Sequence, residues 1–245
     1  MGPRIREIEH GGQTYKLPSV TTVIDRVLAA PELVEWRINT ACEDVISQAD
    51  KLFKEIGDNG YIGCGTFEAE LRARIGSQWK DKKIAGIAAG LGTRVHSLIQ
   101  RHLKEEMGRS LEPLEGESSE RAVSAYEAWQ RWRATQDFRP IEVEKTVYDI
   151  DNMVSGQLDC IAMHNGYRKL IDWKTSKGLY YSHHLQVSAY WMCEKFLGNH
   201  GIIGALIVRV PKDGGEVKDV VEIDEKELHR LAGQFKVLRQ MYDEV

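Results

Sequence analysis

The sequence predicts an α/β fold in which a mixed central β-sheet is flanked by helices. With 245 residues, of which 42% are hydrophobic, the chain can bury a sizeable core. Near Pro140 the apolar pattern changes from helical spacing to the alternation that is typical of strands. We therefore predict a single domain, in which residues 1–86 are mainly a helical elaboration and residues 87–245 form the core. Two small domains would also fit this length.

A short hairpin and several helices are expected in the first half of the chain. Ile5 to Leu17 is hairpin-like, with a turn at Gly11-Gly12. The stretch "LPSVTTVIDRVL" then enters a helix that Ser19, Thr21 or Thr22 can cap, because their hydroxyls accept from unpaired amides. Further helices are predicted over Pro31 to about Ile56, about Phe67 to Trp79, about Ile87 to Met107, and from Ser118 or Ser119 through "RAVSAYEAWQRWRATQ".

The second half is predicted to supply the sheet. Three strands are expected in "IEVEKTVYDI", "MVSGQLDCIAM" and "YRKLIDWKT", followed by a helix in "HHLQVSAYWMCEKF". Two more strands, "IGALIVRV" and "EVKDVVEI", turn at "PKDGG", and a final helix covers Glu225 to Tyr242.

Composition argues against several classes of protein. The formal net charge of −4 disfavours a uniformly basic surface but is compatible with a local basic groove. The four cysteines form no C-x-x-C pair, so neither a zinc ribbon nor a regular disulfide framework is indicated. No apolar run resembles a membrane span or a secretory signal, so we expect a cytoplasmic protein of a bacterial or phage-infected cell, without membrane contact.

The tetrapeptide "HNGY" is the strongest local signal in the chain. Asn-Gly favours a two-residue hairpin turn, because both turn residues need positive φ. With Asn165-Gly166 as the turn, His164 faces Tyr167 and, further along, Asp159 faces Asp172. Alternate residues of a strand share a face, so Lys174 is expected on the same side as both aspartates.

Two directly opposed carboxylates repel each other unless a positive charge lies between them. Carboxylate oxygens suit Mg²⁺ or Mn²⁺, and a neighbouring ammonium can orient a water or stabilise charge on a phosphate. The alternative is a solvent-facing strand whose carboxylates diverge or pair with Arg168 and Lys169. Leu170 and Ile161 look buried, which favours the metal site.

Around this hairpin, several motifs follow one another in a recognisable order. They are "GTRVH" (Gly92 to His96), "GQLD" (Gly156 to Asp159), "IDWKTSK" (Ile171 to Lys177) and "LQVSAY" (Leu185 to Tyr190). Together they resemble the RecB-like exonuclease branch of the PD-(D/E)XK nuclease superfamily. The opening "LPSVTTVI" is similar to the N-terminal signature of its phage and mitochondrial-genome-maintenance members. The resemblance covers Leu17 to Ile24 and roughly Ala88 to Val210, and implies the PD-(D/E)XK fold.

The resemblance also implies a role for individual residues. His96, Asp159, Asp172 and the backbone carbonyl of Trp173 would be ligands of one or two Mg²⁺ or Mn²⁺ ions. Lys174 would be the catalytic lysine. Gln186 and Tyr190 would hold this lysine and the nucleic acid, and because they are four residues apart in a helix, they share a face.

Other candidates are less firmly assigned by the resemblance. The family often places a glutamate on the strand before the hairpin that carries the aspartates. Glu144 matches that position better than Glu142, although both residues lie on the same face of the predicted strand. Arg94, Lys177, His183 and His184 can contact phosphates around a cleft, but scattered surface charges are equally expected.

The resemblance implies metal-dependent hydrolysis of DNA phosphodiester bonds, most plausibly as an exonuclease in recombination, repair or end processing. Single-stranded DNA or DNA ends would be the substrate, with a recombination or single-strand-annealing protein as a candidate partner. No cysteine follows Cys193, so an iron–sulfur cluster is not expected, and no P-loop motif is present. The alternatives are an endonuclease of the same fold, structure-specific or sequence-tolerant, and a nucleic-acid-binding protein without catalysis.

Overall fold

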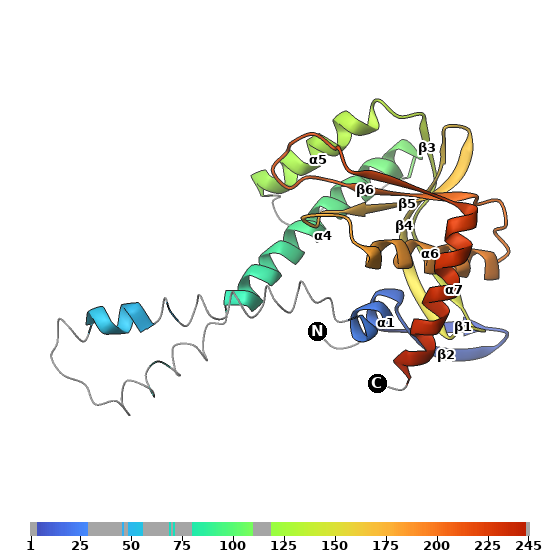
Figure 1. Cartoon of the computed structure of the whole chain (residues 1–245). Helices are drawn as coiled ribbons and strands as arrows, with labels where there is room; N and C mark the ends of the chain where they lie inside the picture. The colour runs from blue at the N-terminus through green and yellow to red at the C-terminus, as the bar shows by residue number, and fades with distance from the viewer. Residues whose placement is uncertain are drawn as a thin grey trace. The chain divides into compact units, whose positions relative to one another are not determined.

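The computed structural model of the chain describes residues 4–28, 46, 49–55, 69, 71, 80–109 and 119–243 (Figure 1). It divides the chain into two compact units, one formed by Met1–Leu28 with Leu91–Val245 and the other by Ala29–Gly90. Residues 49–55 are helical. The remainder of the helices predicted for Pro31 to Ile56 and Phe67 to Trp79 lies almost entirely outside the described residues.

A mixed sheet forms the centre of the larger unit, as predicted. Among the described residues its five strands follow the order β3-β4-β5-β6-β7. They are β3 (Phe138–Asp149), β4 (Val154–His164), β5 (Tyr167–Lys174), β6 (Gly204–Arg209) and β7 (Val220–Asp224). Only β5 and β6 are parallel, since α6 (Tyr181–Phe196) connects them. The strand predicted for "EVKDVVEI" is correct but shorter than expected.

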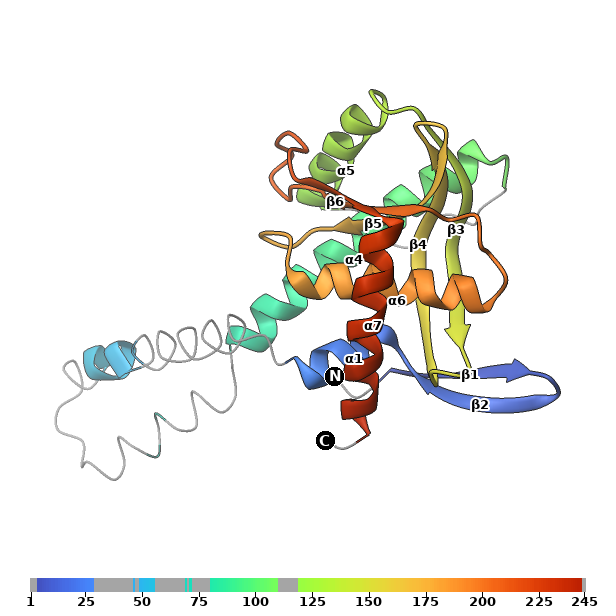
Figure 2. The same ribbon diagram turned by 45° about the vertical axis from the view of Figure 1, so that its right-hand side comes forward.

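Helices cover both faces of this sheet (Figure 2). One buried cluster joins the sheet to α1 (Val20–Val27), α6 and α7 (Glu225–Tyr242). A second joins the opposite face to α5 (Glu120–Arg133) and to the part of α4 (Lys80–Glu106) that follows residue 90. Asp224 caps α7 by accepting from the Glu227 amide, which fixes the helix start at the predicted residue. The helix predicted from about Ile87 begins earlier, at Lys80.

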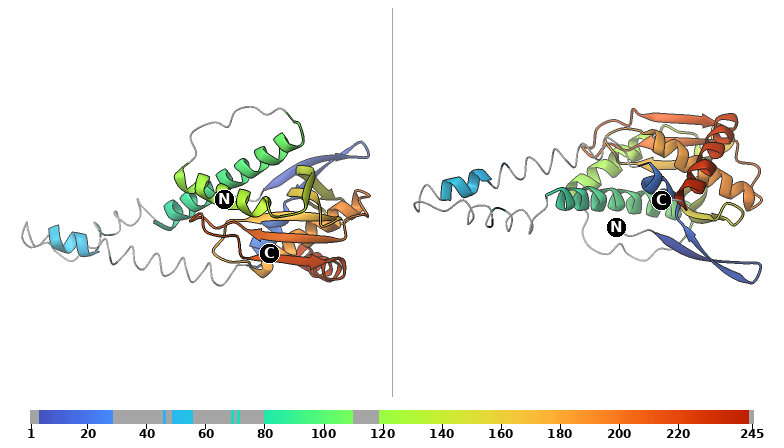
Figure 3. Two further views of the ribbon diagram at one scale, coloured as in Figure 1. Left: turned by 90° about the horizontal axis from the view of Figure 1, so that it is seen from above. Right: turned by 60° about the horizontal axis from the view of Figure 1, so that its bottom comes forward.

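Residues 4–28 form a separate two-stranded hairpin and a helix, which contact the five-stranded sheet (Figure 3). Strands β1 (Ile5–His10) and β2 (Gln13–Pro18) pair across the predicted Gly11-Gly12 turn, where both glycines have positive φ. Ser19 bridges to Ser155 of β4. Of the three capping candidates, Ser19 is the N-cap of α1, and its hydroxyl accepts from the Thr22 amide.

The predicted β4–β5 hairpin is confirmed near its turn. Asn165 and Gly166 have φ of 51° and 77°, as a two-residue hairpin turn requires. Five residue pairs keep the predicted register, from His164 opposite Tyr167 to Cys160 opposite Ile171. No helix of the described segments has both the length and the apolar character of a membrane span.

A buried carboxylate ties β3 to α6. The Glu194 side chain is 0% exposed and lies 3.0 Å from the Lys145 ammonium, measured from Oε1 to Nζ. Asn199 donates a hydrogen bond to the other carboxylate oxygen. Lys145 also pairs with Glu142 at 3.0 Å, so one ammonium balances two acids. Without it, Glu194 would be a buried charge with no counterion.

We expect Lys145→Met to lower the free energy of unfolding by about 2 kcal/mol, because it leaves the Glu194 charge buried and unpaired. Urea denaturation measures this loss. The matched variant Lys145→Met/Glu194→Gln removes the charge as well and should recover part of the stability. A Lys145→Met protein as stable as the parent would contradict the assignment.

Candidate active site

Strands β4 and β5 separate just beyond their last regular pair. Cys160 pairs with Ile171, but at the next position the Trp173 amide donates to Asp159 Oδ2 at 2.9 Å. A carboxylate therefore replaces the backbone acceptor that a continuing ladder would provide. Leu158 and Ile161 pack in the same hydrophobic cluster, although residues three apart in a regular strand point to opposite faces of the sheet. The side chains of β4 therefore switch faces between these two residues. The predicted direct pairing of Asp159 with Asp172 falls in this irregular part and is not formed as a ladder pair.

His96 reaches Asp159 from α4. Its Nδ1 lies 3.5 Å from Asp159 Oδ2, and the buried Val95 and Ile99 on either side fix the helix against the sheet. Burial alone would lower the pKa of His96, but the Asp159 carboxylate outweighs it and the pKa is raised. A Cβ on Gly92 would come within 2.8 Å of Thr175 Oγ1, so glycine lets α4 approach the loop after β5.

Asp172 and Lys174 form a close ion pair at the end of β5. Asp172 Oδ2 lies 2.7 Å from Lys174 Nζ, and both side chains are largely buried. Burial raises the pKa of Asp172 to about 6, although Lys174 opposes the shift. For Asp159, His96 and Lys174 overcome the effect of burial and its pKa is lowered. Asp159 is therefore the more readily ionised of the two acids.

A chain of hydrogen bonds fixes Lys174 from the side of α6. Lys174 Nζ donates to Gln186 Oε1 at 2.7 Å, and Gln186 Nε2 donates to the Tyr190 hydroxyl at 2.8 Å. Tyr190 is buried over Gly156, where an added Cβ would lie 2.4 Å from the ring carbon Cε1. Gly156 is thus needed for Tyr190 to occupy this position.

The structure separates the two glutamates that the sequence left open. Glu142 pairs with Lys145 at 3.0 Å, whereas Glu144 lines a cavity next to Asp159. Glu144 has a φ of 57°, and its carboxylate accepts a hydrogen bond from Gln157 Nε2. Burial, followed by the repulsion from Asp159, raises the pKa of Glu144.

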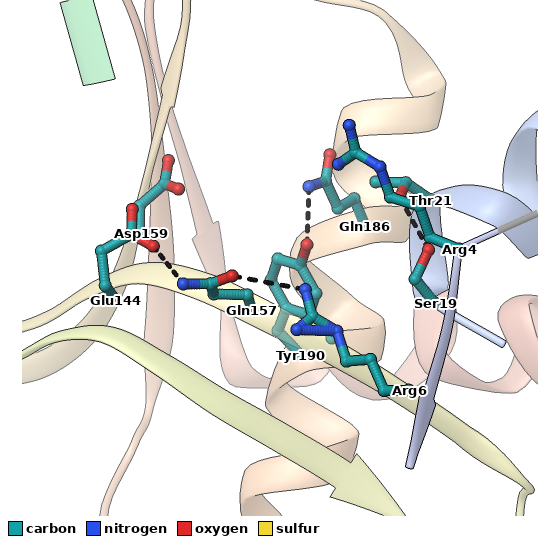
Figure 4. Close-up of a pocket in the computed structure, with 10 residues that line it drawn as sticks. Arg4, Arg6, Ser19, Thr21, Glu144, Gln157, Asp159, Gln186 and Tyr190 are labelled. Atoms are coloured by element: carbon teal, nitrogen blue, oxygen red, sulfur yellow. Dashed lines mark hydrogen bonds between the residues drawn. The ribbon is translucent and has the colours of Figure 1, made fainter. Parts of the chain in front are cut away.

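The cavity beside these residues has a volume of about 210 Å³ (Figure 4). The described residues that line it come from the N-terminal hairpin, α1, β3, β4 and α6: Arg4, Arg6, Ser19, Thr21, Glu144, Gly156, Gln157, Asp159, Gln186 and Tyr190. Sequence reasoning gave no site role to Arg4 and Arg6. The available signal was their spacing of two residues at the start of the predicted Ile5–Leu17 hairpin, because residues two apart in extended chain lie on one face.

Three predicted phosphate contacts do not line this cavity. Arg94 is half-buried on α4, two residues before His96. Lys177 is exposed in the loop after β5, and the His184 ring packs against Tyr181 with ring centroids 6.3 Å apart. The Trp173 side chain is buried among aromatic rings, so only its backbone faces the acids.

The donor set fits a hard divalent cation. Asp172 Oδ2 is buried and, despite the nearby ammonium, has no hydrogen bond of normal geometry among the described residues. Such an oxygen gains from a cation, and carboxylates suit Mg²⁺ or Mn²⁺. Within the described segments no three acidic, histidine or cysteine side chains stand together as a complete metal cage. Lys174 and His96 instead contact the two aspartates.

Comparison with known proteins gives one informative match. The family model described as "PD-(D/E)XK nuclease superfamily" matches residues 66–244, which include all the acids described above. A solved structure titled "Crystal structure of SSO0001" is 22% identical, with 68% of this chain and 70% of that chain covered, at a TM-score of 0.31. No curated protein matches the chain.

The start of α6, which carries Gln186, depends on a neutral histidine. The Tyr180 amide donates to His183 Nδ1 at 3.1 Å, a contact that a protonated ring cannot accept. Burial, with help from Lys174 and His184, lowers the pKa of His183 to about 3. Below the unfolded-state pKa of about 6.5, only the unfolded chain takes up the proton, so stability falls as the pH falls.

We expect the wild type to lose about 1 kcal/mol more stability between pH 7 and pH 5 than His183→Gln. Titration of the unfolded-state ring between these pH values gives about 2 kcal/mol, and this is halved because the ring is partly exposed to screening solvent. Urea denaturation at both pH values measures the difference. Equal losses in the two proteins would exclude His183 as the titrating group.

Proposed function

The chain belongs to the PD-(D/E)XK nuclease superfamily, and we propose that it is a divalent-metal-dependent exonuclease that hydrolyses phosphodiester bonds of DNA. The observation that carries this proposal is the meeting of Asp159, Asp172 and Lys174 where β4 and β5 separate. One buried and one half-buried acid with a lysine beside them are costly for stability, and such groups are common at catalytic sites.

In this proposal Asp159 and Asp172 hold the cation, together with His96 and the Trp173 backbone carbonyl. A bound Mg²⁺ or Mn²⁺ ion supplies a nucleophilic water and neutralises charge on the phosphate. Glu144 lies close enough to Asp159 for this carboxylate to raise the pKa of Glu144, and Glu144 would bind the ion through a water. The proposed metal ligands are carboxylates, one imidazole and a backbone carbonyl, whereas iron–sulfur clusters are held by cysteines, so the proposal includes no iron–sulfur cluster.

Lys174 is the residue placed to act on the reacting groups. Its ammonium donates to Gln186 and pairs with Asp172, which leaves a donor for a water or a phosphate oxygen. Gln186 and Tyr190 are positioning residues, because their hydrogen-bond chain fixes the ammonium before substrate arrives.

The choice of DNA, and of its ends, rests on the motifs shared with the RecB-like branch. On this basis Arg94, Lys177 and His184 contact the nucleic acid away from the cavity. The proposal extends to a role in recombination, repair or end processing in a bacterial or phage-infected cell, with a single-strand-annealing protein as the candidate partner.

We expect Lys174→Ala to lower metal-dependent DNA hydrolysis at least about 100-fold, because the charge on the reacting phosphate loses its fixed donor. End-labelled single- and double-stranded DNA with Mg²⁺ or Mn²⁺ provides the assay. Lys226→Ala, which removes an exposed lysine of α7, is the matched control and should retain activity.

Two outcomes of this assay would overturn parts of the proposal. Hydrolysis that is unchanged in Lys174→Ala would exclude the assigned site. Cleavage of circular single-stranded DNA at the rate of linear DNA would show that no end is needed, and would make the protein an endonuclease.

Metal binding can be tested without substrate. We expect Mn²⁺ at 100 times its dissociation constant to stabilise the protein by about 2.7 kcal/mol, which raises the melting temperature by roughly 5–10 °C. Asp159→Asn and Asp172→Asn should abolish this rise, while Asp151→Asn, an exposed aspartate after β3, should preserve it. A rise that survives both site substitutions would place the cation elsewhere.

A further inference from the structure

Two arginines form a basic wall opposite the acids of the cavity. Arg4 immediately precedes β1 and Arg6 lies within it, and both side chains line the cavity. In Figure 4 they lie on the opposite side from Glu144 and Asp159. The cavity therefore has a positive side and a negative side.

Neither guanidinium forms an ion pair with any described residue. Arg6 Nη2 donates to Gln157 Oε1 at 3.3 Å, but Arg6 Nε is buried and has no hydrogen-bond partner among the residues that the structure describes. A buried N–H donor without an acceptor is destabilising, so a ligand that brings an oxygen to it would be favoured. Because neither guanidinium has an ion-pair partner within the described part of the chain, an anionic oxygen is a good match for both.

The size of the cavity restricts which anion fits. Its volume of about 210 Å³ is below the roughly 300–1,000 Å³ of pockets that enclose drug-sized ligands. It can take a phosphate group, while an entire nucleotide would extend beyond it. The planar donors of arginine match phosphate oxygens, and the Thr21 hydroxyl adds a further polar contact.

We propose that Arg4 and Arg6, assisted by Thr21, bind a second phosphate of the nucleic-acid strand, next to the one that is hydrolysed. This inference rests on the proposed nuclease function. The scissile phosphate must lie against Asp159 and its neighbours, so the basic wall is left for an adjacent phosphate of the same strand. This phosphate fixes how far the strand enters and hence which bond reaches Lys174.

Gln157 links the two sides of the cavity. Its amide nitrogen donates to Glu144 and its oxygen accepts from Arg6. A phosphate held by Arg6 would therefore be coupled to the orientation of an acid next to the metal-binding aspartates. Two sources share the required chemistry: an internal phosphodiester, and a phosphate monoester at the strand end.

Binding of single-stranded DNA in a chelator, where no hydrolysis occurs, tests the subsite. We expect Arg4→Gln and Arg6→Gln each to weaken binding about tenfold and to lower the slope of log Kd against log salt by about 1. Arg139→Gln removes an exposed arginine of β3 away from the cavity and is the matched control. Circular dichroism confirms that each variant is folded. Equal binding by the Arg6→Gln and Arg139→Gln proteins would overturn the proposal.

Replacing single phosphates by uncharged methylphosphonates identifies which phosphate of the strand the arginines bind. Single methylphosphonates are placed along the strand one linkage at a time, and ends with 5′-phosphate or 5′-hydroxyl are compared. One position should weaken binding to the wild type about tenfold and have no further effect in Arg6→Gln. A position inside the strand identifies a phosphodiester, and an effect of the 5′ end identifies a monoester. Equal effects on both proteins at every position would exclude the subsite.

These measurements separate the two proposals, because they need neither metal nor hydrolysis. If binding depends on the arginines but Lys174→Ala leaves hydrolysis unchanged, the active-site assignment fails and the phosphate subsite stands. If hydrolysis depends on Lys174 but binding ignores both arginines, only the subsite fails.

Discussion

The hydrogen bond from the Trp173 amide to the Asp159 carboxylate is the interaction on which the site depends. It ends the β4–β5 ladder without leaving a buried N–H donor unsatisfied. Because the ladder ends there, Asp159 and Asp172 can lie beside each other at an opening of the sheet. Helix α4 then approaches from one face with His96, and α6 from the other with Gln186.

The acids at this opening are stabilised by the protein's own cations. Asp159 contacts His96, and Asp172 contacts Lys174. Asp172 Oδ2 has no hydrogen bond of normal geometry among the described residues, although the Lys174 ammonium lies 2.7 Å away. Burial of charge without full compensation lowers stability, so it is retained where chemistry needs it. Lys145 and Asn199 contact Glu194 in a similar way, and its Oε1 is likewise buried without a hydrogen bond of normal geometry among the described residues.

Local patterns in the sequence predicted most of the fold. The Asn165-Gly166 turn sets the β4–β5 register through the backbone conformation of two residues, and β6, β7 and α7 follow from apolar alternation and capping. The same register was not kept at Asp159, because the β4–β5 ladder ends at Cys160–Ile171 and the Asp159 side chain accepts the hydrogen bond of the Trp173 amide. The contribution of Arg4 and Arg6 was not predictable either, since it needs the N-terminal hairpin to join β4 across more than 130 residues. The resemblance of the chain's motifs supplied the remaining candidates and favoured Glu144 over Glu142, and Glu144 is the one that lines the cavity.

Glu144 shows how the backbone makes that choice. The register places it level with Asp159, between the pairs Val143–Cys160 and Lys145–Leu158, but its φ of 57° is unusual for a residue with a side chain. Such a conformation costs roughly 1–2 kcal/mol and persists where the surroundings fix it, often at functional sites. Here it brings the carboxylate to Gln157, which also contacts Arg6. Glu144 therefore connects the acids of the sheet to the arginines of the hairpin through Gln157. A regular strand conformation at this position would remove that connection between the two sides of the cavity.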